Sequence, residues 1–389
     1  MENTSSTTAA SAWDRVVERR GSDSMKWGRY GADVLPLWVA DMDFAAPPAV
    51  IAALQARLDH GVFGYGLETE ALNAAAVNYV QRRYGWQIEA EWLVWLPGLV
   101  SALNVACKAV DGGVFTATPV YPPFMSAPAN EGRALVTTAL RDTASGWQWD
   151  FAEVERRLAA SGSKLWLLCH PHNPVGRAWR DEELREIARL AQKHDLVVCS
   201  DEIHCDLILD PQRRHTPFAM LGEDAARRSI TLMAPSKTYN IPGLGAAWAV
   251  IPDADLRAHF RRAMVGIVPH PNVMGTAATI AALNSCDDWL AGLLDYLRGN
   301  ARLVENAVAA TPGLRMHAVE ATYLAWIDAG EFCRQHGFAD VEAWCRAAGV
   351  ALSSGADFAP ECAHFVRLNF GCPRPLLNQA LARLFGKTT

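Results

Sequence analysis

The feature that most constrains the fold is an alternation, in the middle of the chain, between short apolar or β-branched runs and amphipathic runs. Strands and helices that alternate in this way form a mainly parallel sheet covered by helices. The predicted strands are Val114–Ala117, Leu165–Cys169, Leu196–Ser200, Ile230–Ala234 and Ala246–Ile251. We therefore expect an α/β fold built on a mainly parallel central sheet.

Several segments between and before these strands have the period of a helix. Asp181–Lys193 places its apolar residues on one face, opens with acidic residues and closes with a lysine, in agreement with the helix dipole. Pro48–Asp59 and Leu67–Tyr84 are also predicted helices, and each is followed by a glycine that acts as a stop signal. A further helix is predicted at Ala102–Val110, after the strand Leu93–Leu96.

The length of 389 residues is enough for roughly two or three domain-sized units. We expect residues 48–283 to form a large domain, and residues 284–389 to form a smaller α/β domain together with the N-terminal segment 13–47. Residues 1–12 are small and polar, so we predict a disordered tail there. In the C-terminal part we predict helices at Trp289–Ala310 and Val341–Ala348, and strands at Tyr323–Ile327 and Phe365–Phe370.

Composition excludes several classes of function. The net charge of −6 gives no basic patch for nucleic acid, and the longest apolar runs are far shorter than the roughly 20 residues that span a bilayer. The N-terminus has neither the basic nor the apolar region of a signal peptide. The nine cysteines include no C-x-x-C pair, which favours reduced thiols, a cytoplasmic protein and no metal site.

Reactive side chains follow three of the predicted strands, at the point where each strand ends. Asn173 comes after the first of these strands, Asp201 and His204 after the second, and Lys237 after the third. Ligands bind beyond the carboxyl ends of the strands in an open α/β sheet. We therefore expect an amide, a carboxylate and an amine to meet at one edge of the sheet.

This set of groups is what pyridoxal 5′-phosphate requires. A lysine amine forms a Schiff base with the cofactor's aldehyde, and a carboxylate keeps the pyridine nitrogen protonated so that the ring can accept electrons. Asn173 and His204 can both hydrogen-bond the phenolic oxygen of the ring. The glycine of Pro97-Gly98-Leu99, between a strand and a helix, can form a phosphate site from free backbone N–H groups.

Six stretches make the sequence similar to a known family. They are Leu37–Phe44 (LWVADMDF), Thr118–Phe124 (TPVYPPF), Pro171–Arg177 (PHNPVGR), Asp201–His204 (DEIH), Ser236–Asn240 (SKTYN) and Arg367–Gly371 (RLNFG). With these stretches the chain resembles the fold-type I pyridoxal-phosphate enzymes of aminotransferase class I/II. It is most similar to the MalY/PatB-type cystathionine β-lyases, which are carbon–sulfur lyases. The resemblance runs from Trp38 to Arg374.

The resemblance implies a role for each matching residue. Lys237 corresponds to the Schiff-base lysine that also removes the Cα proton, and Asp201 to the partner of the pyridine nitrogen. Asn173 corresponds to the partner of the phenolic oxygen, and His204 occupies a position where many relatives have a tyrosine that contacts the same oxygen. Tyr121 matches the aromatic residue that stacks on the ring. The phosphate is assigned to Gly98, Leu99 and Ser236, and the substrate carboxylate to Arg367.

The resemblance also implies a homodimer with shared active sites. Tyr65, in the stretch Phe63-Gly64-Tyr65-Gly66, matches a tyrosine that family members lend to the phosphate of the neighbouring subunit. Trp38 and Ala40 are expected to line the substrate side of the same pocket.

Two stretches depart from the wider family's pattern. Many aminotransferases carry an arginine eight residues after the lysine to neutralise the phosphate, but Gly245 stands there in this chain. Residues 356–364, just before the strand of Arg367, match no fixed pattern and give no information about the substrate.

The residues alone do not separate elimination from transamination, because both begin with loss of the Cα proton. The resemblance favours a β-lyase that cleaves cystathionine or another L-cysteine S-conjugate to a thiol, pyruvate and ammonia. An aminotransferase of the same fold and a protein with a mainly regulatory or binding role are the alternatives. Which S-conjugate is the substrate stays open.

Overall fold

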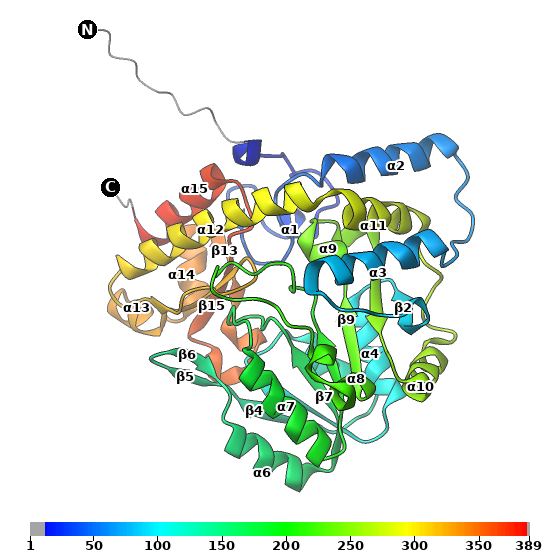
Figure 1. Ribbon diagram of the computed structural model, residues 1–389. Helices are drawn as coiled ribbons and strands as arrows, with labels where there is room; N and C mark the ends of the chain where they lie inside the picture. Colours follow the sequence, from blue (N-terminus) through cyan, green and yellow to red (C-terminus); the bar gives the residue numbers. More distant parts are fainter. Residues whose placement is uncertain (1–11, 387–389) are drawn as a thin grey trace.

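The computed structural model describes residues 12–386, and its main element is a seven-stranded sheet (Figure 1). The strand order is β2-β10-β9-β8-β7-β3-β4. Strands β9, β8, β7, β3 and β4 are parallel, while β10 is antiparallel to both of its neighbours. The strands are β2 (Leu93–Leu96), β3 (Gly113–Thr118), β4 (Leu135–Ala139), β7 (Ser163–Cys169), β8 (Val197–Asp201), β9 (Ser229–Met233) and β10 (Ala247–Val250). The predicted mainly parallel α/β sheet is confirmed.

Fifteen α-helices accompany the strands in the described part of the chain. They are α1 (Met25–Gly28), α2 (Pro48–His60), α3 (Glu70–Tyr84), α4 (Leu99–Ala109), α5 (Pro123–Asn130), α6 (Phe151–Ser161), α7 (Asp181–Lys193), α8 (Glu223–Arg227), α9 (Pro235–Thr238), α10 (Ala254–Met264), α11 (Val273–Ser285), α12 (Asp287–Ala309), α13 (Gly330–Gln335), α14 (Val341–Ala348) and α15 (Arg374–Phe385).

Two predicted helix starts were wrong, and in both cases the residue before the helix explains the difference. Helix α3 begins at Glu70 rather than Leu67, because the Thr69 side chain accepts a hydrogen bond from the Leu72 N–H and caps the helix. Helix α4 begins at Leu99 rather than Ala102, directly after Gly98. The earlier start brings the free N–H groups of α4 close to the glycine.

Helices cover both faces of the large sheet because its strands are apolar on both sides. In β7, Leu165 and Leu167 join a cluster with residues of α4 and α10, whereas Trp166 and Leu168 join a cluster with residues of α6 and α7. This alternation is the two-residue period of a strand. The doubly covered sheet leaves only its edges and strand ends free to bind ligands.

A second sheet is built from the C-terminal part of the chain. It contains β11 (Arg315–Met316), β12 (Leu324–Asp328), β15 (Phe365–Asn369) and β14 (Ser353–Ser354), in the order β11-β12-β15-β14. The N-terminal strand β1 (Leu35–Pro36) pairs in parallel with β13 (Val350–Ala351). A separate hairpin joins β5 (Arg141–Thr143) to β6 (Gly146–Gln148). In Figure 1, α12 and α15 lie side by side next to this second sheet.

Four further sequence predictions concern the N-terminal tail, membrane spans, cysteines and metal sites. The predicted tail over residues 1–12 lies, apart from Ala12, outside the described residues. No helix within residues 12–386 combines the length and the apolar character needed to cross a membrane. All nine cysteines are buried and unpaired. Within the same described range, no group of three or more His, Cys, Asp or Glu side chains is arranged to hold a metal ion.

Candidate active site

Four adjacent parallel strands deliver the predicted residues to one edge of the large sheet. Tyr121 follows β3, Asn173 follows β7, Asp201 ends β8 and Lys237 lies in α9, directly after β9. They line a cavity of about 300 Å³, which is within the range of small-molecule sites. The predicted residues that line this cavity are Ala40, Gly98, Leu99, Tyr121, Asn173, Asp201, His204, Ser236, Lys237 and Arg367.

The Lys237 amine lies inside the cavity and is held by backbone of the N-terminal segment. Its Nζ donates a hydrogen bond to the carbonyl oxygen of Ala40 at 2.5 Å. Burial lowers the pKa of Lys237 to about 8, although the nearby Asp41 carboxylate acts in the opposite direction. A lysine with this pKa is partly unprotonated near neutral pH, as an amine that attacks an aldehyde must be.

Asp201 is a buried carboxyl group at the centre of the sheet. One of its oxygens accepts a hydrogen bond from the Ile203 N–H at 3.1 Å. Burial raises the pKa of Asp201 to about 7, against the effect of the Lys237 ammonium. A cationic ring nitrogen beside this carboxyl group would stabilise its ionised form, so the position suits a partner for a protonated pyridine.

Asn173 and Arg367 are joined by a direct hydrogen bond across the cavity. The Arg367 Nη1 donates to the Asn173 Oδ1 at 3.0 Å, and the Nη2 donates to the Trp38 carbonyl oxygen at 2.9 Å. The bond to Oδ1 orients the Asn173 amide, so that its NH₂ group is the end left to donate to a ligand. Arg367 is buried over the ring of Phe358. Its Nε has no hydrogen-bond partner, and burial lowers its pKa to about 10.

The aromatic side of the cavity consists of Tyr121 and His204. The Tyr121 N–H donates to the Asn173 carbonyl oxygen at 3.1 Å, which fixes the two residues relative to each other. His204 is buried, and its Nδ1 has no hydrogen-bond partner. Burial lowers the pKa of His204, and the positive charges of Lys237 and Arg367 add to that effect. A neutral imidazole can donate one hydrogen bond to a ligand, which is compatible with the predicted contact to an oxygen.

At the other end of the cavity lie Gly98, Leu99 and Ser236, together with Ser101, which the sequence analysis did not assign. Gly98 precedes α4, so the first N–H groups of an eleven-residue helix point to this end. Such a helix start favours a bound anion. Gly245 adopts a φ of +58° in the left-handed region, where an arginine would be strained. This backbone conformation favours glycine at position 245.

The segment from Trp38 to Asp41 is held over the cavity by its backbone carbonyl groups. The Asn369 amide donates to the carbonyl oxygens of Val39 and Asp41, both at 2.7 Å. The Tyr323 hydroxyl donates to the Ala40 carbonyl oxygen at 2.9 Å. Asp41, Tyr323 and Asn369 were not predicted as site residues. Asp41 and Asn369 lie in the stretches LWVADMDF and RLNFG, whose resemblance to the family was the available signal.

Charged side chains behind this segment complete its support. Asp43 is buried and accepts hydrogen bonds from the Lys26 Nζ at 2.7 Å and from the Arg19 Nη1 at 2.6 Å. Arg19 also binds Asp41 at 2.7 Å. Two anionic and two cationic side chains thus balance one another, which offsets the cost of burying them.

Two of the predicted site residues, Trp38 and Tyr65, do not line the cavity. Trp38 contributes its carbonyl oxygen to the site, while its indole N–H donates to the Lys26 carbonyl oxygen and its ring packs against Arg29. Tyr65 is 99% exposed on the loop between α2 and α3 and does not line the cavity of its own chain.

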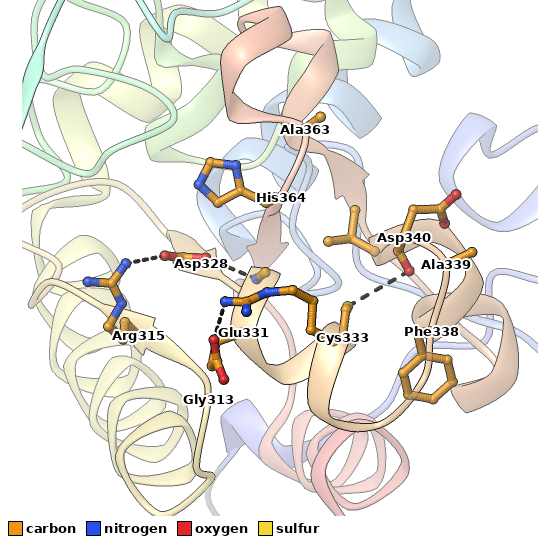
Figure 2. Close-up of a pocket in the computed structure, with 13 residues that line it drawn as sticks. Gly313, Arg315, Asp328, Glu331, Cys333, Phe338, Ala339, Asp340, Ala363 and His364 are labelled. Atoms are coloured by element: carbon orange, nitrogen blue, oxygen red, sulfur yellow. Dashed lines mark hydrogen bonds and ion pairs between the residues drawn. The ribbon is translucent and has the colours of Figure 1, made fainter.

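A second hollow is lined mainly by residues of α13 and by residues at the ends of β11 and β12 (Figure 2). Its charged side chains are largely paired with each other, as in the Arg315–Asp328 and Arg334–Glu331 ion pairs. The cavity at the sheet edge differs because it holds an amine, an arginine and an imidazole with unused hydrogen-bonding capacity. We therefore take the sheet-edge cavity as the candidate active site.

Comparison with known proteins shows the family of this chain. The model of the family "Aminotransferase class I and II" matches residues 32–384. The chain belongs to this family. The cystathionine β-lyase PatB of Bacillus subtilis is 37% identical to this chain, and the match covers 96% of this chain and 98% of PatB.

Two solved structures show the same fold as this family member. The structure of OvoB has a TM-score of 0.91 and 48% sequence identity, over 95% of this chain and 97% of that chain. Cystalysin from Treponema denticola, whose structure contains pyridoxal 5′-phosphate, has a TM-score of 0.90 and 32% identity over 96% and 97% of the two chains. The predicted family and the predicted fold-type I architecture are confirmed.

The residues of the cavity fit pyridoxal 5′-phosphate. Asp201 would suit a ring nitrogen, and the Lys237 amine would suit an aldehyde. His204 Nδ1 and Arg367 Nε are buried polar atoms that lack partners and need them. The start of α4 suits the phosphate. The donor set therefore matches the cofactor at each of its functional groups.

Proposed function

We propose that this protein is a pyridoxal-phosphate-dependent carbon–sulfur β-lyase that cleaves cystathionine or another L-cysteine S-conjugate. The products are a thiol, pyruvate and ammonia. The observation that carries the proposal is the meeting of Lys237, Asp201 and the Asn173–Arg367 pair in one cavity. The similarity to PatB over nearly the whole chain supports elimination rather than another reaction of the same cofactor.

The cofactor, when bound, supplies an electron sink that makes the Cα–H bond of an amino acid acidic. Asp201 would hold the proton on the ring nitrogen, because a buried carboxylate favours a cationic partner. The Asn173 NH₂ and the His204 imidazole would donate to the phenolic oxygen. Tyr121 would cover one face of the ring.

Arg367 orients the substrate by binding its α-carboxylate with two parallel hydrogen bonds. The guanidinium is already fixed by Asn173, the Trp38 carbonyl and Ser353, so little side-chain entropy is lost on binding. Binding of the carboxylate by this preorganised guanidinium would direct the Cα–H bond towards Lys237.

Lys237 moves the protons of the reaction. Its amine would take the Cα proton of the bound substrate and become an ammonium group. Two groups face this ammonium: the Ala40 carbonyl accepts a hydrogen bond from it, and the Asp41 carboxylate stabilises its charge. That ammonium would then give its proton to the sulfur as the Cβ–S bond breaks and the electron pair left at Cα forms a Cα=Cβ bond. Water would convert the released enamine to pyruvate and ammonia.

We further propose a homodimer in which Tyr65 completes the phosphate site of the partner subunit. Support comes from apolar side chains at least half exposed on α2 and on the loop that follows it, namely Ile51, Leu58, Val62, Phe63, Tyr65 and Leu67. Isolated soluble chains rarely expose so many together. Ultracentrifugation should give twice the mass of one chain, and a single-chain mass would contradict the dimer.

The division into an N-terminal segment 13–47, a large domain 48–283 and a small domain 284–389 is also our proposal. The pairing of β1 with β13 supports it, because that pairing attaches the N-terminal segment to the C-terminal part. We propose the cytoplasm as the location, since nine buried unpaired thiols suit a reducing compartment.

The deciding experiment measures pyruvate released from cystathionine and from several cysteine S-conjugates, without any keto acid present. Release under these conditions is the expected result. Turnover only when a keto acid is added would instead identify an aminotransferase. Bound cofactor with no turnover of any amino acid would favour a regulatory or binding role.

A further inference from the structure

Asp206 is a buried carboxylate that does not line the cavity but is hydrogen-bonded to a residue next to the cavity residue Lys237. It lies five residues after Asp201, and its side chain is 3% exposed. Four side chains donate to it. Oδ2 accepts from the Tyr79 hydroxyl at 2.7 Å and the Thr238 hydroxyl at 2.8 Å, and Oδ1 accepts from the Tyr84 hydroxyl at 2.5 Å and the Arg83 Nε at 3.3 Å.

These donors come from two different parts of the site. Thr238 is the residue directly after Lys237 and ends the short helix α9. Tyr79, Arg83 and Tyr84 lie on α3, which packs behind the site. Asp206 itself belongs to the turns that follow β8, because the Leu207 N–H donates to the His204 carbonyl. One carboxylate therefore connects the segment of Asp201 and His204 with the helix of Lys237.

Helix α9 depends on such contacts for its position. It has four residues, which is too short for a helix to be stable alone. Thr238 binds Asp206, and the Tyr239 hydroxyl donates to the Tyr79 hydroxyl at 3.3 Å. On its other side, Asn240 binds the Met42 and Phe44 carbonyl groups.

We infer that Asp206 is a positioning residue which, through Thr238, sets the spacing between Asp201 and Lys237. The inference rests on the proposed function, in which a rigid ring is held by Asp201 at one side and by Lys237 at another. Sites of this kind tolerate displacements of only about 0.5 Å. A charged group buried so deeply is costly unless its partners are in place, and here the two tyrosines and Arg83 keep it fixed.

The test compares two substitutions that each remove one hydrogen bond to Asp206. Thr238→Val removes the bond to α9 and keeps the shape of the side chain. Tyr84→Phe removes a bond to the other carboxylate oxygen and leaves α9 untouched, so it is the matched control. Thr238→Ser restores the hydroxyl. For each protein, the dissociation constant for pyridoxal 5′-phosphate, the visible absorption maximum, kcat, KM and the thermal midpoint are measured.

We expect Thr238→Val to weaken cofactor binding and to lower kcat by about tenfold each, the effect of one hydrogen bond to a charged group. Its absorption maximum should shift and its KM should stay within about twofold of wild type. Thr238→Ser should restore these values. Tyr84→Phe should lower the thermal midpoint and should change cofactor binding and kcat much less than Thr238→Val does, because its hydrogen bond does not reach α9. Asp206→Asn, which lacks one acceptor oxygen, should exceed Thr238→Val in its effect on cofactor binding and gives a second test if the valine variant does not fold.

Equal changes in Thr238→Val and Tyr84→Phe would reduce Asp206 to a purely structural role and overturn the inference. A Thr238→Val protein with wild-type cofactor binding, spectrum and kcat would overturn it as well. A wild-type protein that binds no pyridoxal 5′-phosphate would instead refute the proposed function, so the two failures are distinguishable.

Discussion

The two halves of the active site are held in place in different ways. The half that faces the cofactor ring takes Tyr121, Asn173, Asp201 and Lys237 from the ends of four neighbouring strands. The half that faces the substrate consists of the segment 38–44 and Arg367, which lie far apart in the sequence and are joined by hydrogen bonds to backbone carbonyl groups.

The difference has a physical cause. Strand ends inherit their position from the hydrogen-bond register of a large sheet with both faces buried, so Tyr121, Asn173 and Asp201 need few contacts of their own. Lys237 lies one step further, in α9, and also needs the contact of Thr238 with Asp206. The segment 38–44, which follows β1, contains no helix or strand. It is held by hydrogen bonds to its individual backbone carbonyl groups, and buried charged side chains lie behind it. We expect substitutions in the strand-end half to change chemistry and substitutions in the segment half to change binding and stability.

Lys237→Ala should have the largest effect. The variant lacks both the amine that binds the aldehyde and the base that moves the proton, so turnover should fall by at least about 10⁴-fold. Pyruvate assays and the visible spectrum measure the two losses separately. Retained lyase activity would refute the role given to Lys237.

Asp201→Ala should lower kcat by about 10³-fold, because the ring nitrogen loses the group that keeps it protonated. Cofactor should still bind, since Lys237 and the phosphate end are intact. Steady-state kinetics on the reconstituted variant provide the measurement. Kinetics like those of wild type would mean that the ring does not need a cationic nitrogen here.

Arg367→Lys tests the substrate half. The lysine keeps the charge but loses the planar fork and the contacts to Asn173 and Trp38, so kcat/KM should fall by about 10²-fold, mainly through KM. A larger change in kcat than in KM would show that Arg367 acts on the chemical step, and the contrast between the two halves would then fail.

The same contrast explains how much the sequence could predict. Asn173, Asp201 and Lys237 each follow a recognisable apolar strand, so the pattern placed them at one sheet edge before any coordinates were known. Tyr323 and Asp206 carry no such signal. Tyr323 meets the Ala40 carbonyl from 283 positions away, and Asp206 meets Thr238 only because α3, β8 and α9 pack together. Local pattern cannot encode such tertiary hydrogen bonds.

Asp43→Asn tests the charges behind the segment and should have the smallest effect on catalysis, a change of about threefold or less, because Asp43 lies behind the cavity. Its effect on stability should be larger, about 3 kcal/mol at pH 7, since Lys26 is left as a buried charge with a weakened partner. The effect on catalysis is measured as kcat, and the effect on stability is measured by denaturant unfolding at several pH values.

The pH dependence of that stability loss follows from the sign of the pKa change. Burial alone would raise the pKa of Asp43, but Lys26, Trp27 and Arg19 together lower it below its ordinary value of 3.8. A carboxyl group with a lowered pKa stabilises the folded state above its unfolded pKa, and this contribution is lost as the pH falls through the folded pKa. The difference between wild type and Asp43→Asn should therefore be constant from pH 7 to about 5 and shrink below about 4. If the difference in unfolding free energy persisted unchanged at acid pH, the shape of the Asp43 side chain rather than its charge would hold the segment. The substrate half would then not depend on buried charges, and the contrast with the strand-end half would fail.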